Sequence, residues 1–173
     1  MAFVKVIRRS MRPEEWTDLR FNMIKKALIN QKIEIKDLYI RDALQIGENE
    51  YNYLNDYRPL NIGDIYFVPD GTVFIKGSVK IPEELKNSEV YLLFHTAAEM
   101  IVKINGYFAG GIDPNRDKIL LNPWLKDDNI SIEIEAFNRS KPDDERNPDA
   151  MDSRGCRQIF QGAFICTINQ SLL

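Results

Sequence analysis

The sequence predicts a mainly β protein: a jelly-roll-like antiparallel β-sandwich with an N-terminal helix. The first sign is Asn105-Gly106, between the apolar runs MIVKI and YFAGGI. A two-residue type I′ turn needs positive φ at both central positions, and Asn and Gly adopt it at least cost. The second is a change to period-two alternation from Ile65 onward. The third is the series of short apolar runs separated by turn residues, which is typical of sandwiches and jelly rolls.

Size and composition are those of a globular domain. The chain has 173 residues, of which 44% are hydrophobic and 28% charged, which is enough apolar content for a core. A formal net charge of −3 provides no basic field for a phosphate backbone, so we expect no nucleic-acid partner. No apolar run approaches the roughly 20 residues of a membrane span, and the N-terminus lacks the order of a signal peptide. Cys156 and Cys166 are too few for a disulfide framework, which favours a cytoplasmic protein with free thiols.

The first predicted element is a helix from Pro13 to Ile29. Proline suits a first helical turn, and the acidic residues that follow it favour the positive end of the helix dipole. Apolar residues recur at helical spacing and form one stripe: Trp16, Leu19, Met23, Ile24, Ala27 and Leu28. We expect this stripe, Trp16 included, to pack in the core.

The next segment carries weaker signals. Apolar residues between Ile33 and Ile40 indicate a short strand or an irregular extended segment, and residues 47–64 favour loop with short strands. Tyr51, Tyr53 and Tyr57 could stack on a sugar or cover the end of the sandwich, and the second role needs no special cause. We therefore predict a helical and irregular segment over residues 1–60, packed on a sandwich over residues 61–173.

The strands that follow are defined by alternation. Val73, Ile75, Val79 and Ile81 share one face of a strand that ends at Pro82. Residues 90–94 are apolar on both faces, as expected for an inner strand, and residues 100–104 and 107–112 flank the Asn-Gly turn. Further strands are predicted at 119–121, 130–136 and 160–168. Residues 139–155 read as an exposed loop, and the abrupt end behind the last strand suggests a fragment of a longer chain.

A catalytic set is not visible in the sequence. His95 is the only histidine and has no second ligand or nucleophile elbow near it, so we interpret it as structural. The acidic loop at 143–152 could bind Ca²⁺ but lacks the spacing of a calcium loop, which favours a solvated loop. Glu133 and Glu135 share the polar face of one strand, where solvent exposure explains them.

Candidate contact residues gather around the central hairpin in the sequence. Glycan binding and docking on another domain would use the same residue types, namely aromatic rings, planar polar side chains and arginine. We favour interdomain docking for the set, although each ring taken alone fits core packing. The candidates are Tyr107, Phe108, Asp113, Asn115, Arg116 and Trp124.

Four segments in this order resemble the N-terminal, galactose-binding-like β-sandwich of glycoside hydrolase family 38, the retaining α-mannosidases. They are PDGTVFIKGSVKIPEEL, HTAAEMIVKINGYFAGGIDPNRDKILL, IEIEAFNRS and IFQGAFICTINQ, which together cover most of residues 65–170. The matching positions are Pro82-Glu83, Glu99, Asn105-Gly106, Gly111-Ile112-Asp113, and Glu135 with Asn138.

This resemblance implies a non-catalytic accessory domain, with the catalytic domain of the same polypeptide as its partner. In that family a zinc site with a His-x-Asp element lies in the catalytic domain. Here His95 is followed by Thr96-Ala97, so no zinc is expected in this chain. Asn115-Arg116 replaces a histidine of the family loop. The resemblance also implies a possible homo-oligomer of the parent enzyme; the alternative is a carbohydrate-binding module of another glycosidase, with a glycan as partner.

Overall fold

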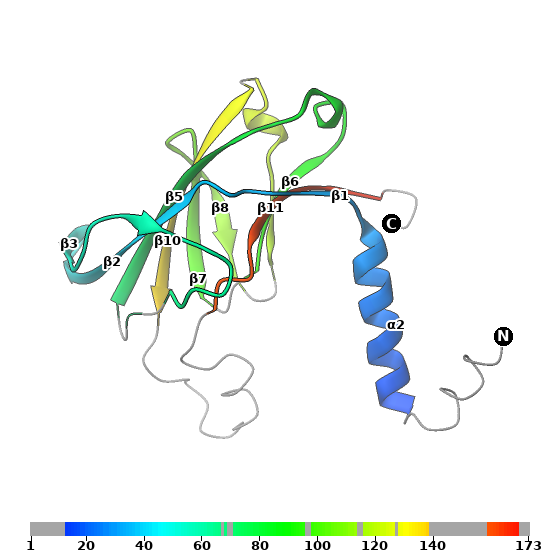
Figure 1. Ribbon diagram of the computed structural model, residues 1–173, viewed down its shortest axis with the longest axis horizontal. Helices are drawn as coiled ribbons and strands as arrows, with labels where there is room; N and C mark the ends of the chain where they lie inside the picture. The colour runs from blue at the N-terminus through cyan, green and yellow to red at the C-terminus, as the bar shows by residue number, and fades with distance from the viewer. Residues whose placement is uncertain are drawn as a thin grey trace.

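The strands predicted from the period-two pattern form two antiparallel sheets (Figure 1). The computed structural model describes residues 13–66, 68, 71–95, 98–113, 116–126, 128–138 and 159–169. Cys156, Asn115 and the predicted loop at 139–155 lie outside these residues. Within them the fold is the predicted antiparallel β-sandwich, with one long helix near the N-terminus.

The smaller sheet has four strands. Their order is β1 (Ile29–Glu34), β11 (Ala163–Ile168), β6 (Val90–Phe94) and β9 (Lys118–Leu120). The predicted inner strand is confirmed, because β6 lies between β11 and β9 and four of its five residues are buried. Its last residue, Phe94, is fully buried with its ring centroid 5.4 Å from that of Phe160.

The larger sheet has seven strands. Their order is β3 (Glu50–Tyr53), β2 (Leu38–Gly47), β5 (Gly71–Lys80), β10 (Asn129–Asn138), β7 (Glu99–Ile104) and β8 (Tyr107–Ile112), while β4 (Arg58–Pro59) pairs with β2. The predicted turn joins β7 to β8, with φ of 51° at Asn105 and 79° at Gly106. Residues 29–59, assigned from the sequence to a separate segment, thus contribute strands to both sheets.

The hydrophobic core fills the space between the sheets. Along β10, Ile130, Ile132, Ile134 and Ala136 are buried, whereas Ser131 and Glu133 are exposed on the opposite face. The same alternation holds on β5 and β7, so the central strands of the large sheet present one apolar and one polar face. Two 3₁₀ turns, η1 (Glu83–Leu85) and η2 (Asn122–Trp124), lie in the connections, and Leu85 reaches the core.

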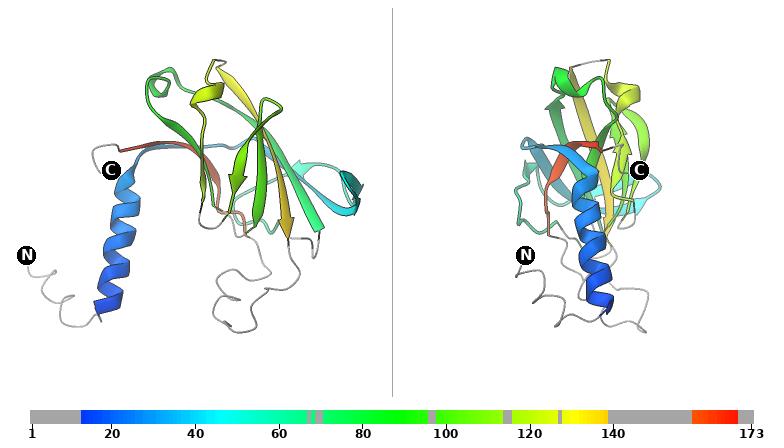
Figure 2. Two further views of the ribbon diagram at one scale, coloured as in Figure 1. Left: turned by 180° about the vertical axis from the view of Figure 1, so that it is seen from behind. Right: turned by 90° about the vertical axis from the view of Figure 1, so that its right-hand side faces the viewer.

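The helix α2 (Pro13–Leu28) matches its predicted bounds to within one residue, but its surroundings differ from the prediction. It extends away from the sandwich and leads directly into β1 (Figures 1 and 2). Leu19, Met23 and Ile24 of the apolar stripe are 37%, 62% and 55% exposed, and Trp16 is half-buried with the Arg20 guanidinium 5.8 Å from its ring. The prediction of core packing is therefore wrong. An amphipathic period shows that a helix has an apolar face, but not which surface covers that face.

No helix among the described residues is long and apolar enough to cross a membrane.

Candidate functional site

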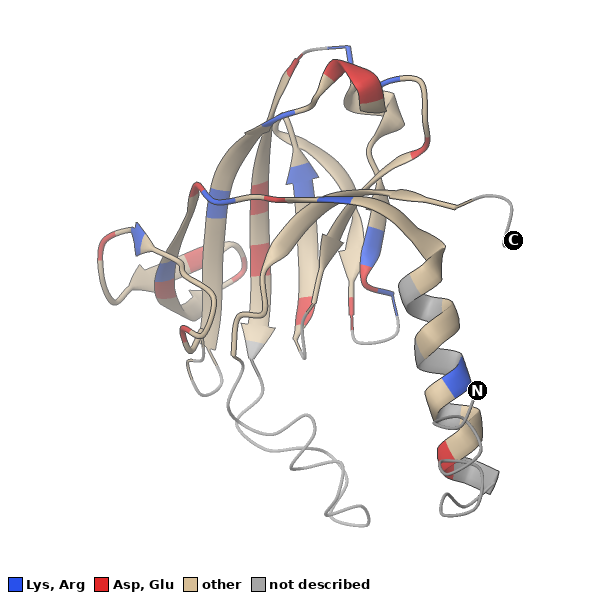
Figure 3. Ribbon diagram, turned by 45° about the vertical axis from the view of Figure 1, so that its right-hand side comes forward, with Lys and Arg blue, Asp and Glu red and all other residues tan. Residues whose placement is uncertain are grey.

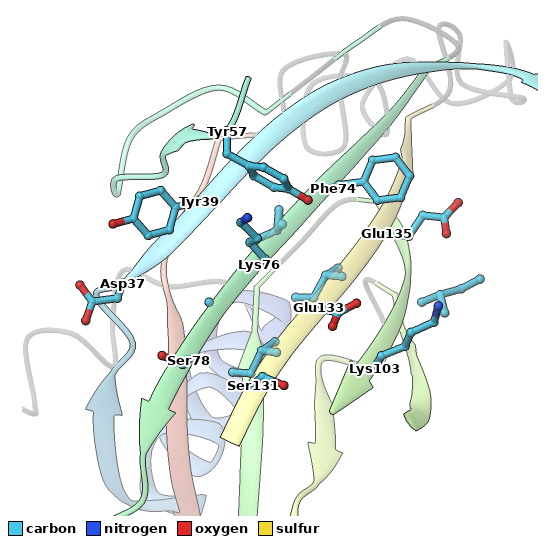
Figure 4. Close-up of a pocket in the computed structure, with 15 residues that line it drawn as sticks. Asp37, Tyr39, Tyr57, Phe74, Lys76, Ser78, Lys103, Ser131, Glu133 and Glu135 are labelled. Carbon is cyan, nitrogen blue, oxygen red and sulfur yellow. The ribbon is translucent and has the colours of Figure 1, made fainter. Parts of the chain in front are cut away.

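A groove of about 520 Å³ lies on the outer face of the large sheet (Figure 4). Its floor is formed by β5, β10 and β7, the three central strands, and one side is closed by aromatic residues of β2 and of the segment before β4. The volume falls within the range of about 300–1,000 Å³ that is usual for small-molecule sites. The labelled lining residues in Figure 4 are Asp37, Tyr39, Tyr57, Phe74, Lys76, Ser78, Lys103, Ser131, Glu133 and Glu135.

Strand register places charged side chains in one row across the groove. Glu133 of β10 pairs with Lys76 of β5 on one side and with Lys103 of β7 on the other. Lys76 in turn pairs with Tyr39 of β2. Directly opposed residues of antiparallel strands share a face, with Cβ atoms about 5 Å apart. The resulting row is Tyr–Lys–Glu–Lys, and the alternation of basic and acidic strands is visible in Figure 3.

A second row carries the aromatic wall. Glu135 pairs with Phe74, and the Tyr51 hydroxyl donates a hydrogen bond to the Glu135 carboxylate. The Tyr51 ring meets Phe74 edge-on, with centroids 4.8 Å apart. The Arg41 guanidinium lies 3.4 Å from the ring centroid of Tyr53. These ring and cation contacts pack Tyr51 and Tyr53 against Phe74, which lines the groove.

The hydrogen bond to Glu135 raises the pKa of the Tyr51 phenol to about 12, with burial adding to the shift. The phenol therefore stays protonated at neutral pH and remains the donor. Glu135 Oε1 therefore accepts a hydrogen bond from Tyr51, whereas Glu133 makes no hydrogen bond or ion pair within the described residues.

The middle of the groove holds polar groups that the protein itself does not use. Within the described part of the chain, Glu133 and Lys103 form no ion pair, and the Tyr39 ring, 42% exposed, meets neither an aromatic ring nor a cation. Lys76 differs, because its ammonium lies 3.7 Å from the Tyr57 ring centroid. An acceptor, a donor and a flat ring face are thus available to a ligand.

The sequence-predicted contact residues lie mostly outside this groove. Tyr107 and Phe108, 72% and 69% exposed, begin β8 at the edge of the large sheet. Phe108 pairs with Lys103 across the strands, so it shares the groove face, whereas Tyr107 pairs with the buried Ile104.

Asp113 and Arg116 lie beyond the opposite end of β8 and bind each other. The Arg116 Nη2 is 2.9 Å and its Nε 3.0 Å from Asp113 Oδ2, so the two side chains form an ion pair with each other. Trp124 is half-buried in η2 and packs on the core. The set therefore does not converge on one site within the described residues, and its role in contacts stays a prediction.

His95 lies on the other sheet, at the end of β6. It is half-buried, its Nδ1 is 3.8 Å from Asp117 Oδ2, and its ring meets Phe164 at a centroid distance of 6.4 Å. Burial lowers the pKa of His95, while the charge of Asp117 opposes this effect. Among the residues that the structure describes, no group of three or more His, Cys, Asp or Glu could hold a metal ion.

Residues of the groove could not be assembled from the sequence because its walls come from strands whose order was unknown. The sequence signal for the groove is the set of polar residues that alternate with the buried ones along each strand, including Lys76, Lys103 and Glu133. The sequence predicts that Tyr51, Tyr53 and Tyr57 cover the end of the sandwich. In the structure the first two pack against Phe74 on the outer face, and the third lines the groove.

No protein-family model and no curated protein matches this sequence. Solved structures do match. A β-glycosidase from Bacteroides vulgatus matches over 79% of this chain and 20% of its own, with a TM-score of 0.52 and 18% identity. A β-glucuronidase from Ruminococcus gnavus in complex with D-glucaro-1,5-lactone matches over 81% and 30%, at a TM-score of 0.50 and 9% identity. An FMN-binding β-glucuronidase from Faecalibacterium prausnitzii matches over 81% of this chain and 22% of its own, with a TM-score of 0.50 and 16% identity.

These similarities concern the fold. The chain spans less than a third of the length of each of these proteins and shares its β-sandwich with part of them. A sandwich that also occurs in glycosidases agrees with the sequence resemblance at the level of glycoside hydrolases. The resemblance to α-mannosidases in particular gains no support, because these structures are described as a β-glycosidase and as β-glucuronidases.

Proposed function

We propose that this chain is a non-catalytic β-sandwich domain of a glycoside hydrolase, which supports a catalytic domain of the same polypeptide. The observation that carries the proposal is the match to solved glycosidases over about four-fifths of this chain but at most 30% of theirs. The order of the sequence motifs, which does not depend on the fold, points to the same class of enzyme. Fold alone does not define function, so both supports are needed.

The finer proposal is an α-mannosidase. It is supported by the order of Pro82-Glu83, Asn105-Gly106 and Gly111-Ile112-Asp113, and by nothing in the structural comparisons. The structure gives these motifs local roles. Pro82 follows β5, which ends at Lys80, Asn105 and Gly106 form the hairpin turn, and Asp113 pairs with Arg116. Each role is one that a β-sandwich of any glycosidase could use.

The test begins with the reading frame that encodes the chain, which we expect to continue into a glycosidase catalytic domain. The longer polypeptide and the 173-residue chain are then assayed on p-nitrophenyl α-mannoside and p-nitrophenyl β-glucuronide. We expect turnover of one substrate by the longer polypeptide only, and which substrate it is decides the finer proposal. Turnover by the 173-residue chain, or a reading frame without a catalytic domain, would contradict the accessory role.

A further inference from the structure

We propose that the groove on the outer face of the large sheet binds a neutral saccharide, which would give this chain a ligand of its own beyond its supporting role. The proposal stands on three features of the groove: a free aromatic face, free polar groups placed beside it, and a balance of charge.

The aromatic face is that of Tyr39. Sugar rings present an apolar C–H face that packs on a flat aromatic ring, and a ring at the rim of a groove can accept it without rearrangement. Tyr39 lies on β2 at the groove margin and is 42% exposed, and the ring contacts among described residues involve its neighbours Tyr51, Tyr53, Tyr57 and Phe74 instead. The wall around Tyr39 is therefore already packed, while the Tyr39 ring is still available.

The free polar groups are Glu133 and Lys103, and Ser131 lies beside them with its hydroxyl donating to Asn105 Oδ1 at 3.4 Å. A carboxylate accepts hydrogen bonds and an ammonium donates them, so the two together can bind the vicinal hydroxyl groups of a pyranose. Strand pairing places Lys103 directly opposite Glu133, and Ser131 is two residues before Glu133 on the same face of β10. Neither Glu133 nor Lys103 has an ion-pair partner within the described residues, so a ligand would not have to break a bond within the protein.

The charge of the groove selects a neutral ligand over an acidic one. Its lining includes three carboxylates, Asp37, Glu133 and Glu135, against two lysines, Lys76 and Lys103. The lining therefore has no excess positive charge with which to attract a uronate or a phosphate. The lining also includes apolar residues such as Ile101, which is 49% exposed. A neutral polyhydroxylated ligand with apolar faces matches this mixture.

Isothermal titration calorimetry of the whole chain tests the proposal, with mannotetraose, cellotetraose and maltotetraose as neutral probes and tetragalacturonate as the acidic comparison. We expect at least one neutral probe to bind with a Kd below about 1 mM, and tetragalacturonate to bind at least about tenfold more weakly. Absence of heat with all neutral probes at about 10 mM would overturn the proposal and leave the groove as a contact surface for another protein domain. Tighter binding of tetragalacturonate would also overturn it.

Variants then locate the site. We expect Tyr39→Ala to weaken binding of the neutral probe at least about tenfold, and Glu133→Gln about three- to tenfold. The matched controls are Tyr91→Ala, a partly exposed tyrosine on β6 of the other sheet, and Glu84→Gln, an exposed glutamate on η1. Both should change Kd by less than about twofold. Equal losses in variant and control would overturn the assignment to the groove. Urea unfolding of all four variants identifies any loss caused by misfolding. The outcome is independent of whether the parent protein is a glycosidase, because binding is measured on this chain alone.

Discussion

One side of the groove depends on a close approach between β5 at Gly77 and the start of β2, and replacing this glycine tests that packing. Gly77 pairs with Leu38, and its backbone does not have the positive φ that would require a glycine. A Cβ at this position would lie 2.4 Å from the Asp37 carbonyl oxygen and 2.6 Å from Leu38 Cδ2. The leucine methyl can rotate, but the carbonyl oxygen belongs to the backbone and moves only if the two strands separate.

We expect Gly77→Ala to lower the free energy of unfolding by about 2 kcal/mol. Overpacking of a fitted site costs about 1–3 kcal/mol, and a backbone neighbour places this case in the upper half of that range. The alanine recovers about 0.5–1 kcal/mol, because it restricts the unfolded chain more than glycine does. For a chain of this size the net loss corresponds to a fall in Tm of about 4–8 °C.

Urea unfolding followed by circular dichroism measures this loss, with Gly111→Ala as the matched control. Gly111 lies in β8 of the same sheet, and the nearest heavy atom to its added Cβ is the Met100 carbonyl oxygen at 3.5 Å, an ordinary contact. The control should be neutral or stabilising by about 0.5 kcal/mol. Equal free energies of unfolding for the two variants would refute the argument that β2 and β5 are closely packed at Gly77.

Three further predictions concern the groove wall, the helix and the core. Tyr51→Phe should cost about 1 kcal/mol in urea unfolding at pH 8, because Glu135 loses its hydrogen-bond donor. Since the folded-state pKa of Tyr51 is raised from 10.0 to about 12, the stabilisation is present below pH 10 and lost as pH rises toward 12. The wild type should therefore lose its advantage over Tyr51→Phe between about pH 10 and 12, and a constant difference across that range would contradict this. The double variant Met23→Ser, Ile24→Ser should change the free energy of unfolding by less than about 0.5 kcal/mol, because both side chains are mostly exposed. A loss of several kcal/mol would instead indicate that the helix packs in the core. Phe94→Ala should cost about 3–5 kcal/mol in the same assay, because the ring is fully buried against Phe160, and a cost below about 1 kcal/mol would be inconsistent with the described core.

Local patterns in the sequence were sufficient for the fold class and for most strands. The Asn105-Gly106 turn and the alternation in residues 130–136 depend on neighbouring residues only, and the structure confirms both. The strands from β1 to β4 were harder to predict because buried and exposed residues do not alternate regularly along them. In β2, for example, buried residues occur at Leu38, Ile40 and Ala43, which follows no single period. The helix bounds were predictable for the same local reason, but its exposed stripe was not, because no helical pattern specifies a partner.

The groove was not predictable because it depends on register between strands far apart in the sequence. Lys76, Lys103 and Glu133 lie on three strands joined by long connections, and only pairing brings them into one row. A shift of one residue in any of these strands would turn its charged side chain toward the core. By contrast, the candidates from Tyr107 to Trp124 are close in the chain but spread over both ends of β8 and the η2 turn.

The most direct test of the central claim is a ¹H–¹⁵N correlation spectrum of the chain during titration with each neutral tetrasaccharide. If the groove on the outer face of the large sheet binds the saccharide, the largest amide shifts will occur in β5 and β10, from Phe74 to Ser78 and from Ser131 to Glu135. The shifts should saturate with the Kd obtained by calorimetry. Shifts concentrated instead between Tyr107 and Arg116, or none in β5 and β10 at about 10 mM saccharide, would contradict the account.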